Sequence, residues 1–268
     1  EAFARAPVGT GPYAAEQWNA QGVRLSRNSY AWRPPQADRL TILNVPDTSS
    51  RVTALQTGAL DIALFMGPED TPQVESFGGR MAVYPQGSVI GLSYILVKES
   101  PLSDPRVRQA MTYAVNRQAI ADIIFAGQTR PASQASSHLA FGHDPTLQPY
   151  PYDPARARAL LRDAGYGDGF AFTADVVLPQ PTDSLFWQQV AADLARVGIT
   201  MSINTMTFAR FIEGMYQGTW TGTAFGMNYN SLPALDALIG FQFHSCLWIK
   251  PWVCDEIQAN LLRRAERE

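Results

Sequence analysis

The chain has 268 residues, with 21 Lys and Arg against 24 Asp and Glu, so its formal net charge is −3. With 46% hydrophobic and 17% charged residues, it can bury a sizeable core and is neither disordered nor fibrous. The acidic balance and the lack of a basic cluster argue against a nucleic-acid partner. No apolar run reaches the roughly 18 residues of a membrane span. The first residues, Glu1 to Arg5, do not have the pattern of a signal peptide, so we expect the chain to begin inside a longer product.

The first part of the chain is predicted to be rich in strands. Three runs have the apolar or alternating pattern of strands: residues 22–27, 39–45 and 60–65. Between the second and third runs, Asp47 or Thr48 can cap a short helix that ends at Gly58. We therefore predict that the second and third runs form a parallel pair joined by this helix, with the third run buried.

The remainder of the chain is predicted to alternate helices and strands. Asp104 and Pro105 mark the start of the clearest helix, because Asp caps a helix and Pro fits its first position. Asp153 and Pro154 begin a second helix in the same way. Further elements are predicted at residues 87–97 (extended), 171–178 (strand), 183–197 (helix), 199–205 (strand) and 208–216 (helix). This alternation predicts an α/β fold.

The sequence contains no recognisable catalytic set. The histidines are His138, His143 and His244, and none lies within a helical turn of a candidate nucleophile. Neither a nucleophile elbow nor a phosphate-binding glycine loop is present. Asp61, Glu69 and Asp70 could pair as carboxylates, but caps and solvated turns explain such residues more often. We therefore expect a protein that is not an enzyme and has no cofactor.

The two cysteines, Cys246 and Cys254, have two interpretations. With His244 they offer at most three soft ligands, fewer than the four of a typical structural zinc site. A disulfide competes for both sulfurs and is favoured over a metal site, although two thiols alone do not fix the redox compartment. We expect no metal.

Residues 214–249 form an uncharged stretch in which Asp236 is the only formally charged residue. The stretch is rich in aromatic residues: Tyr216, Trp220, Phe225, Tyr229, Phe241, Phe243 and Trp248. One interpretation is a buried strand followed by a loop. The other is a ligand-facing wall, with aromatic planes for apolar contact and neutral amides and hydroxyls for orientation. The residues alone do not choose between them.

Four segments resemble the solute-binding proteins of bacterial peptide, opine and nickel ABC importers, the family 5 extracellular type. They are residues 9–13, 50–61, 101–117 and 152–166, and the third resembles its counterpart almost residue for residue. The resemblance implies an α/β, two-lobed periplasmic-binding-protein-like (type II) architecture, incomplete in this chain. Residues 1–97 would be a partial first lobe that ends in a crossover strand at residues 92–97, and residues 98–268 a partial second lobe.

The resemblance also implies a function. The protein would bind peptides or peptide-like solutes outside the cytoplasmic membrane, in the periplasm or on a lipid anchor, and deliver them to ABC permease subunits. It would neither span the membrane nor bind nucleic acid. The alternatives are a nickel-chelate or opine binder of the same importer family, and a ligand sensor that shares the fold but not the transport role.

Residues 225–229 resemble the second-lobe recognition segment of the family, which usually reads Trp-x-x-Asp-Tyr. Phe225 takes the place of Trp, and Asn228 takes the place of the Asp that pairs with the ligand's α-amino group in peptide binders. Since Asn keeps a carbonyl acceptor but has no charge, this change implies a neutral, blocked or non-peptide ligand. The predicted ligand-binding residues are Trp220, Phe225, Asn228, Tyr229, Asn230 and His244.

The cysteine segment resembles one found in dipeptide-binding members. This likeness predicts a disulfide between Cys246 and Cys254 and a helix that starts at Asp255. His244 lies near the position at which nickel-type members present a ligand-contacting histidine. A solvent-exposed or packing histidine is the alternative interpretation.

Overall fold

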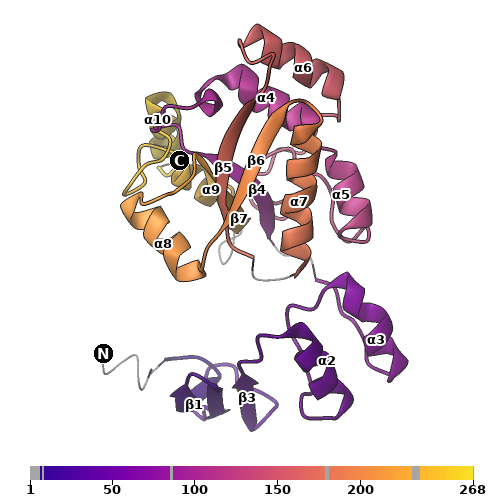
Figure 1. The fold of residues 1–268 in the computed structure, drawn as a ribbon. Coiled ribbons are helices and arrows are strands. Elements are labelled where there is room, and N and C mark those ends of the chain that lie inside the picture. The colour runs from indigo at the N-terminus through magenta and orange to yellow at the C-terminus, as the bar shows by residue number, and fades with distance from the viewer. Residues whose placement is uncertain (1–6, 8, 85–86, 179–180, 231–235, 268) are drawn as a thin grey trace. The chain divides into compact units, whose positions relative to one another are not determined.

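The structure is a computed structural model that describes residues 7, 9–84, 87–178, 181–230 and 236–267. It divides into two compact units, Glu1–Met81 and Ala82–Glu268, which are described separately (Figure 1). The predicted α/β character is confirmed. The predicted lobes, residues 1–97 and 98–268, refer to the complete two-lobed family fold and stay a prediction.

The first unit contains a three-stranded antiparallel sheet in the order β1-β2-β3. The strands are β1 (Tyr13–Asn19), β2 (Gly22–Arg27) and β3 (Arg39–Leu43). Helices α2 (Thr48–Gln56) and α3 (Thr71–Ser76) follow, and a 3-10 turn at Pro68–Asp70 precedes α3. Each helix buries one valine, Val52 and Val74. Of the two predicted caps of α2, Asp47 and Thr48, the structure uses Asp47, whose carboxylate accepts the Ser50 N–H at 2.7 Å.

The predicted buried strand at residues 60–65 is wrong, and so is its parallel pairing with residues 39–45. Ile62 and Phe65 are 75% and 66% exposed, and β3 pairs with β2 instead. Phe65 has a φ of 58°, a left-handed conformation that does not belong in a strand. Its carbonyl accepts a hydrogen bond from the guanidinium of Arg51 at 3.1 Å. The apolar run therefore follows α2 as an irregular segment, because no described strand of this unit lies beside it to complete a ladder.

The second unit is built on a four-stranded sheet in the order β4-β7-β5-β6. The strands are β4 (Ser88–Tyr94), β5 (Phe170–Val176), β6 (Ile199–Thr205) and β7 (Ala224–Asn230). Strand β5 is parallel to both β6 and β7, whereas β4 is antiparallel to β7. The carboxyl ends of β5, β6 and β7 therefore lie at one edge of the sheet, and β4 runs in the opposite direction.

The helices of the second unit cover this sheet (Figure 1). They are α4 (Pro105–Ala114), α5 (Arg117–Ile123), α6 (Pro154–Asp163), α7 (Pro181–Ala195), α8 (Phe208–Gln217), α9 (Leu238–Phe243) and α10 (Glu256–Ala265), with a 3-10 turn at Pro101–Ser103. The predicted caps Asp104, Asp153 and Asp255 each accept a backbone N–H from the first turn of their helix. Helix α8 ends at Gly218, whose φ of 73° is the left-handed conformation that glycine adopts without steric cost.

The sheet of the second unit separates two hydrophobic clusters. The first cluster joins alternate residues of β5 and β6 to α4, α6 and α7, and it includes Ala174, Ile199 and Leu194. The second cluster, on the other side of β7, consists of Ile95, Phe211, Met215, Trp220, Phe225, Met227, Tyr229 and Trp252. Both faces of the sheet are therefore buried, as expected for strands that are parallel in their majority.

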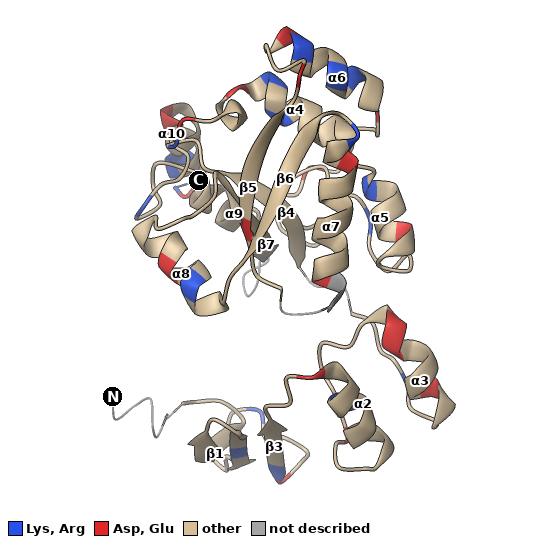
Figure 2. Ribbon diagram, in the orientation of Figure 1, with Lys and Arg blue, Asp and Glu red and all other residues tan. Residues whose placement is uncertain are grey.

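In the second unit, formal charge is confined largely to the helices and loops (Figure 2). Strands β4, β6 and β7 contain no Lys, Arg, Asp or Glu, and β5 contains Asp175 alone. Asp175 is fully buried, and its carboxylate accepts hydrogen bonds from the Thr221 N–H at 2.8 Å, the Gly222 N–H at 3.0 Å and the Asn204 amide at 2.7 Å. It fixes the turn that leads into β7.

The cap of α6 gives a direct test of the fold. We expect Asp153→Ala to lower the free energy of unfolding by about 1 kcal/mol, because the N–H of Arg156 loses its acceptor at 2.9 Å. Asp153→Asn keeps a side-chain oxygen and should retain most of the stability. Urea unfolding of the three proteins measures the difference, and equal losses in both variants would contradict a capping role.

Candidate ligand-binding site

Strand β7 sends its side chains alternately to the two faces of the sheet. Phe225, Met227 and Tyr229 belong to the second hydrophobic cluster, whereas Ala224 belongs to the first. Asn228 lies on the same side of the strand as Ala224 and is exposed. The predicted ligand-binding residues of this strand therefore lie on opposite faces. The side chain of Asn230 lies outside the described part of the chain.

Trp220 and Phe225 form a stacked pair in the core. Their ring centroids are 4.1 Å apart with an interplanar angle of 1°, and the residues are 6% and 0% exposed. The ring of Trp252 meets Phe225 edge to face at 5.0 Å. Such pairs add to the stability that burial alone provides. These aromatic rings contact one another and not the surface.

Asn228 is exposed because the packing on its face of β7 stops at the preceding glycine. A Cβ on Gly226 would lie 2.3 Å from Cζ2 of Trp187, so the indole of α7 rests directly on the backbone there. Two residues further along, Asn228 lies beyond Trp187 and pairs in register with Ile90 of β4. It is close to the carboxyl end of β7, at the edge shared with the ends of β5 and β6.

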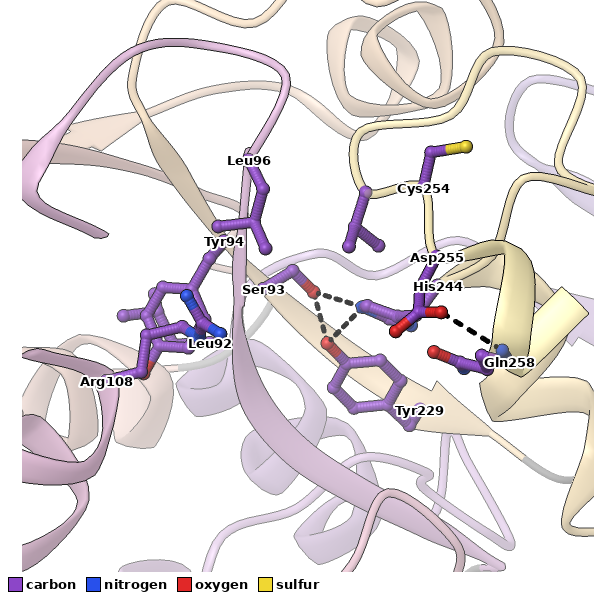
Figure 3. A pocket seen from close by; sticks show the side chains of 11 residues that line it. Leu92, Ser93, Tyr94, Leu96, Arg108, Tyr229, His244, Cys254, Asp255 and Gln258 are labelled. Carbon is purple, nitrogen blue, oxygen red and sulfur yellow. Dashed lines mark hydrogen bonds between the residues drawn. The ribbon is translucent and has the colours of Figure 1, made fainter. Parts of the chain in front are cut away.

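Tyr229 and His244, both predicted from the sequence, meet Ser93, which the sequence did not indicate. The hydroxyls of Ser93 and Tyr229 contact each other, and each lies 3.0 Å from Nε2 of His244 (Figure 3). Nδ1 of His244 lies 3.0 Å from the carbonyl of Gly240. Since a carbonyl only accepts, Nδ1 donates and Nε2 of the neutral ring is the acceptor. We call Ser93, Tyr229 and His244 the polar cluster.

The tyrosine reaches the serine by crossing a glycine. Tyr229 pairs in register with Val89, and Ser93 lies four residues further along β4. The ring passes over Gly91, where a Cβ would be 2.9 Å from Cε2 of Tyr229. A side chain at Gly91 would thus displace the ring from its hydrogen-bonding position. The glycine is required here by close packing and not by its backbone conformation.

Burial sets the protonation of the polar cluster. It lowers the pKa of His244, against the opposing effect of the hydrogen bond to Gly240, and it raises the pKa of Tyr229. Both groups are therefore neutral near pH 7. The arrangement cross-links β4, β7 and the end of α9 through uncharged hydrogen bonds.

The polar cluster lines a pocket of about 590 Å³ in the second unit (Figure 3). Consecutive residues of β4 contribute to it, together with the segment before α10. Its lining residues are Leu92, Ser93, Tyr94, Leu96, Arg108, Tyr229, His244, Val253, Cys254, Asp255 and Gln258. Of the predicted ligand-binding residues, Tyr229 and His244 line this pocket, whereas Trp220, Phe225 and Asn228 do not.

Cys246 and Cys254 form a disulfide, which confirms the predicted pairing. Glu256 lies close to both sulfurs, with all three potential ligand atoms within 4.8 Å of one another. Because the two sulfurs are bonded to each other, they are not available as thiolate ligands. The alternative of a metal site at these cysteines is not supported.

Comparison with known proteins assigns the class of protein that this fold and site define. Residues 1–245 match the family described as bacterial extracellular solute-binding proteins, family 5 Middle. The chain belongs to this family, as its motifs predicted.

Among particular relatives, the chain is similar to the glutathione-binding protein GsiB of Salmonella paratyphi A. The two are 35% identical over 205 residues, which is 75% of this chain and 40% of GsiB. The fold is similar to that of the periplasmic binding protein DppA from Helicobacter pylori, solved with the peptide STSA, with a TM-score of 0.79 and 22% identity over 98% of this chain and 52% of DppA. It is also similar to AgaA of A. tumefaciens R10, solved with agropinic acid, with a TM-score of 0.77 and 21% identity over 100% of this chain and 57% of AgaA.

The chain thus spans less than half the length of this curated relative and just over half of these solved proteins. This similarity and this partial coverage confirm the predicted fold, a two-lobed architecture that is incomplete in this chain. No helix among the described residues is both long enough and apolar enough to cross a membrane.

The buried histidine predicts a pH dependence of stability. The pKa of His244 is lower in the folded state, so the unfolded state binds more protons once the pH falls below the ordinary value of about 6.5. The contribution of His244 to the free energy of unfolding is therefore fully present above about pH 6.5. It is lost as the pH falls from about 6.5 towards the lower pKa of the folded state. Unfolding measured between about pH 7.5 and 5 should show a decline that is smaller in His244→Gln. His143→Gln is the control, and an equal reduction of the slope in both variants would argue against His244.

The crossing at Gly91 predicts an energetic coupling. We expect Gly91→Ala to destabilise the protein by roughly 1–2 kcal/mol, because the new methyl group overlaps the Tyr229 ring. In a Tyr229→Leu background the same change should cost much less, and a double-mutant cycle of unfolding free energies measures the difference. Additive losses would show that the ring and the glycine act independently.

Proposed function

We propose that this chain is part of the extracytoplasmic solute-binding component of an ABC importer, which binds a peptide or peptide-like solute and delivers it to a membrane permease. The observation that carries the proposal is the family match over residues 1–245, together with 35% identity to a glutathione-binding protein over three quarters of the chain. The family description places its members outside the cell membrane, and we assign the full-length protein to the periplasm on that basis.

The sheet topology supports a ligand surface at the carboxyl ends of β5, β6 and β7. In open α/β sheets, ligands bind outside the carboxyl ends of the strands. Those ends lie at one edge here because the three strands are parallel. Asn228, exposed near the end of β7, is the predicted site residue best placed to contact a solute there. Trp220, Phe225 and Tyr229 support it from the core on the opposite face.

The chemistry of Asn228 favours a ligand group without a full positive charge at this position. An amide oxygen accepts a hydrogen bond from an amine or amide N–H, but it lacks the charge that strengthens a bond to an ammonium. Strand β7 has no formal charge that could substitute for it. A peptide with a blocked or remote amino terminus, or a peptide-like conjugate, fits this environment better than a simple peptide with a free α-amino group.

Two alternatives are less well supported by the contacts of the described residues. A nickel-chelate binder would need a free lone pair on His244, yet Nε2 accepts from the polar cluster and Nδ1 donates to Gly240. A hydrolase based on Ser93 and His244 would need a carboxylate to orient the imidazole and donors for an oxyanion. Here the backbone carbonyl of Gly240 contacts the imidazole where a carboxylate would be needed, and Ser93 is only 2% exposed. We therefore propose a binding role.

Native mass spectrometry of the full-length protein tests the proposed function. We expect a co-purified peptide-like solute, and calorimetry with glutathione and short blocked peptides should then show binding. A protein that purifies without such a solute and binds none of these compounds would contradict the proposal. Retention of a metal chelate alone would favour the nickel alternative.

Substitution of Asn228 tests its role separately. We expect Asn228→Asp to raise the affinity for peptides with a free α-amino group by about tenfold, since it restores a charge-assisted hydrogen bond. N-acetylated versions of the same peptides are the control and should gain nothing. Stability should stay the same because the side chain is exposed. An unchanged affinity for both peptide sets would remove Asn228 from the ligand surface.

A further inference from the structure

The disulfide closes a loop that holds the segment following β4. The loop runs from Cys246 to Cys254 and contains Trp252, which is 1% exposed in the second hydrophobic cluster. The backbone carbonyl of Trp252 accepts hydrogen bonds from two successive amides, Leu96 N–H at 2.7 Å and Val97 N–H at 3.2 Å. A covalently closed loop therefore supplies the acceptor for both amides.

The neighbours of these two amides are held by a different part of the chain. The N–H of Ile95 donates to the carbonyl of Thr223 at 2.9 Å. The ammonium of Lys98 donates to the carbonyls of Trp220 and Gly222 at 2.7 and 2.9 Å. The segment is thus attached on one side to the turn before β7 and on the other side to the disulfide loop. Only the second attachment lies within the loop that the disulfide closes.

The two cysteine residues differ in exposure. Cys254 is exposed, whereas Cys246 is half-buried. We therefore expect a thiolate from solvent to attack at the more exposed residue, Cys254, and attack at one sulfur expels the other as the leaving group. Cys254 also lines the pocket described above.

Acidic groups determine which thiols can approach. Cys254 is followed by Asp255 and Glu256, and the carboxylate of Glu256 lies within 4.8 Å of both sulfurs. The carboxylate of Asp255 already accepts the N–H groups of Ile257 and Gln258, so the positive end of α10 is occupied. Arg263 is 3.9 Å from Glu256 in an exposed pair, which offsets its charge only in part. Arg108 lines the same pocket as Cys254, but the carboxylate of Glu256 lies beside the sulfurs and disfavours an anionic thiol there relative to one that carries an amine.

We propose that the Cys246–Cys254 disulfide is an exchange site for small amine-bearing thiols, and that its opening releases the amides of Leu96 and Val97. The thiolate of the small molecule forms a bond to Sγ of Cys254, the Cys254–Cys246 bond breaks, and its electron pair leaves on Sγ of Cys246, which takes a proton from water. The products are a mixed disulfide at Cys254 and a free thiol at Cys246. No other oxidant or reductant is needed.

Exchange rates of two thiols of matched size test the charge preference. The full-length protein is treated at low ionic strength with cysteamine or with 2-mercaptoethanesulfonate. The rate for each thiol is divided by the rate at which the same thiol reacts with a neutral model disulfide. Peptide mapping then locates the adduct. We expect the adduct on Cys254 and a normalised rate about fivefold higher for cysteamine, falling as salt is added. Glu256→Gln should reduce this preference, whereas Glu99→Gln, an exposed control with the same change in charge, should not. An adduct confined to Cys246, no adduct, or equal normalised rates would overturn the proposal.

Hydrogen exchange tests the release. After reduction with a phosphine, which forms no adduct, we expect the amides of Leu96 and Val97 to exchange at least about tenfold faster. The amide of Ile95, bonded to Thr223, should change little and is the internal control. Cys246→Ser/Cys254→Ser should reproduce the reduced state; if it does not fold, reduction of the unaltered protein still gives the answer. Unchanged protection at Leu96 and Val97 would overturn the proposed coupling.

Discussion

The two-residue alternation of β7 is the constraint on which the second unit depends. This strand is hydrogen-bonded to β4 on one side and to β5 on the other, and a hydrophobic cluster covers each of its two faces along most of its length. Phe225 and Tyr229 enter one hydrophobic cluster, Ala224 enters the other, and Gly226 admits the Trp187 ring. Only towards the carboxyl end, at Asn228, does a described side chain of the strand reach the surface. The place at which this strand presents a side chain to the surface is therefore set by where the packing ends.

The start of β7 is fixed by two charged groups with several hydrogen-bond partners, the buried Asp175 and the half-buried Lys98. Asp175 accepts two backbone N–H groups of the turn that leads into the strand, and Lys98 donates to two carbonyls of the same turn. A buried carboxylate is tolerated because its oxygens have several donors. This turn also receives the Ile95 amide, so β4 and β7 are held together beyond their ladder. The register of the two strands, which brings Tyr229 across Gly91 to Ser93, depends on these anchors.

Local sequence signals predicted the helices whose starts are stabilised by contacts between residues close together in the sequence. The caps at Asp104, Asp153 and Asp255 mark helix starts because the capping oxygen and the N–H groups it accepts lie within three residues. The run at residues 60–65 has the composition of a strand, but no strand in the described part of the chain pairs with it, and composition cannot supply that information. The polar cluster is the opposite case, since Ser93 and Tyr229 are 136 residues apart. Their contact follows from register and from the absence of a side chain at Gly91. Residue spacing along the sequence predicts neither the register of the two strands nor the need for a glycine at this position.

The division of β7 into two faces also determines how changes at the site have to be interpreted. A substitution at Phe225 or Tyr229 removes packing in a cluster that includes Trp220 and Trp252, so it lowers stability before it can affect a solute. A substitution at Asn228 changes the surface and leaves that cluster intact. Loss of binding in the first group therefore does not identify a ligand contact unless the free energy of unfolding is unchanged. Altered binding at Asn228 with unchanged stability would identify one, because on this strand the alternation separates the side chains that support the fold from the one that reaches the surface.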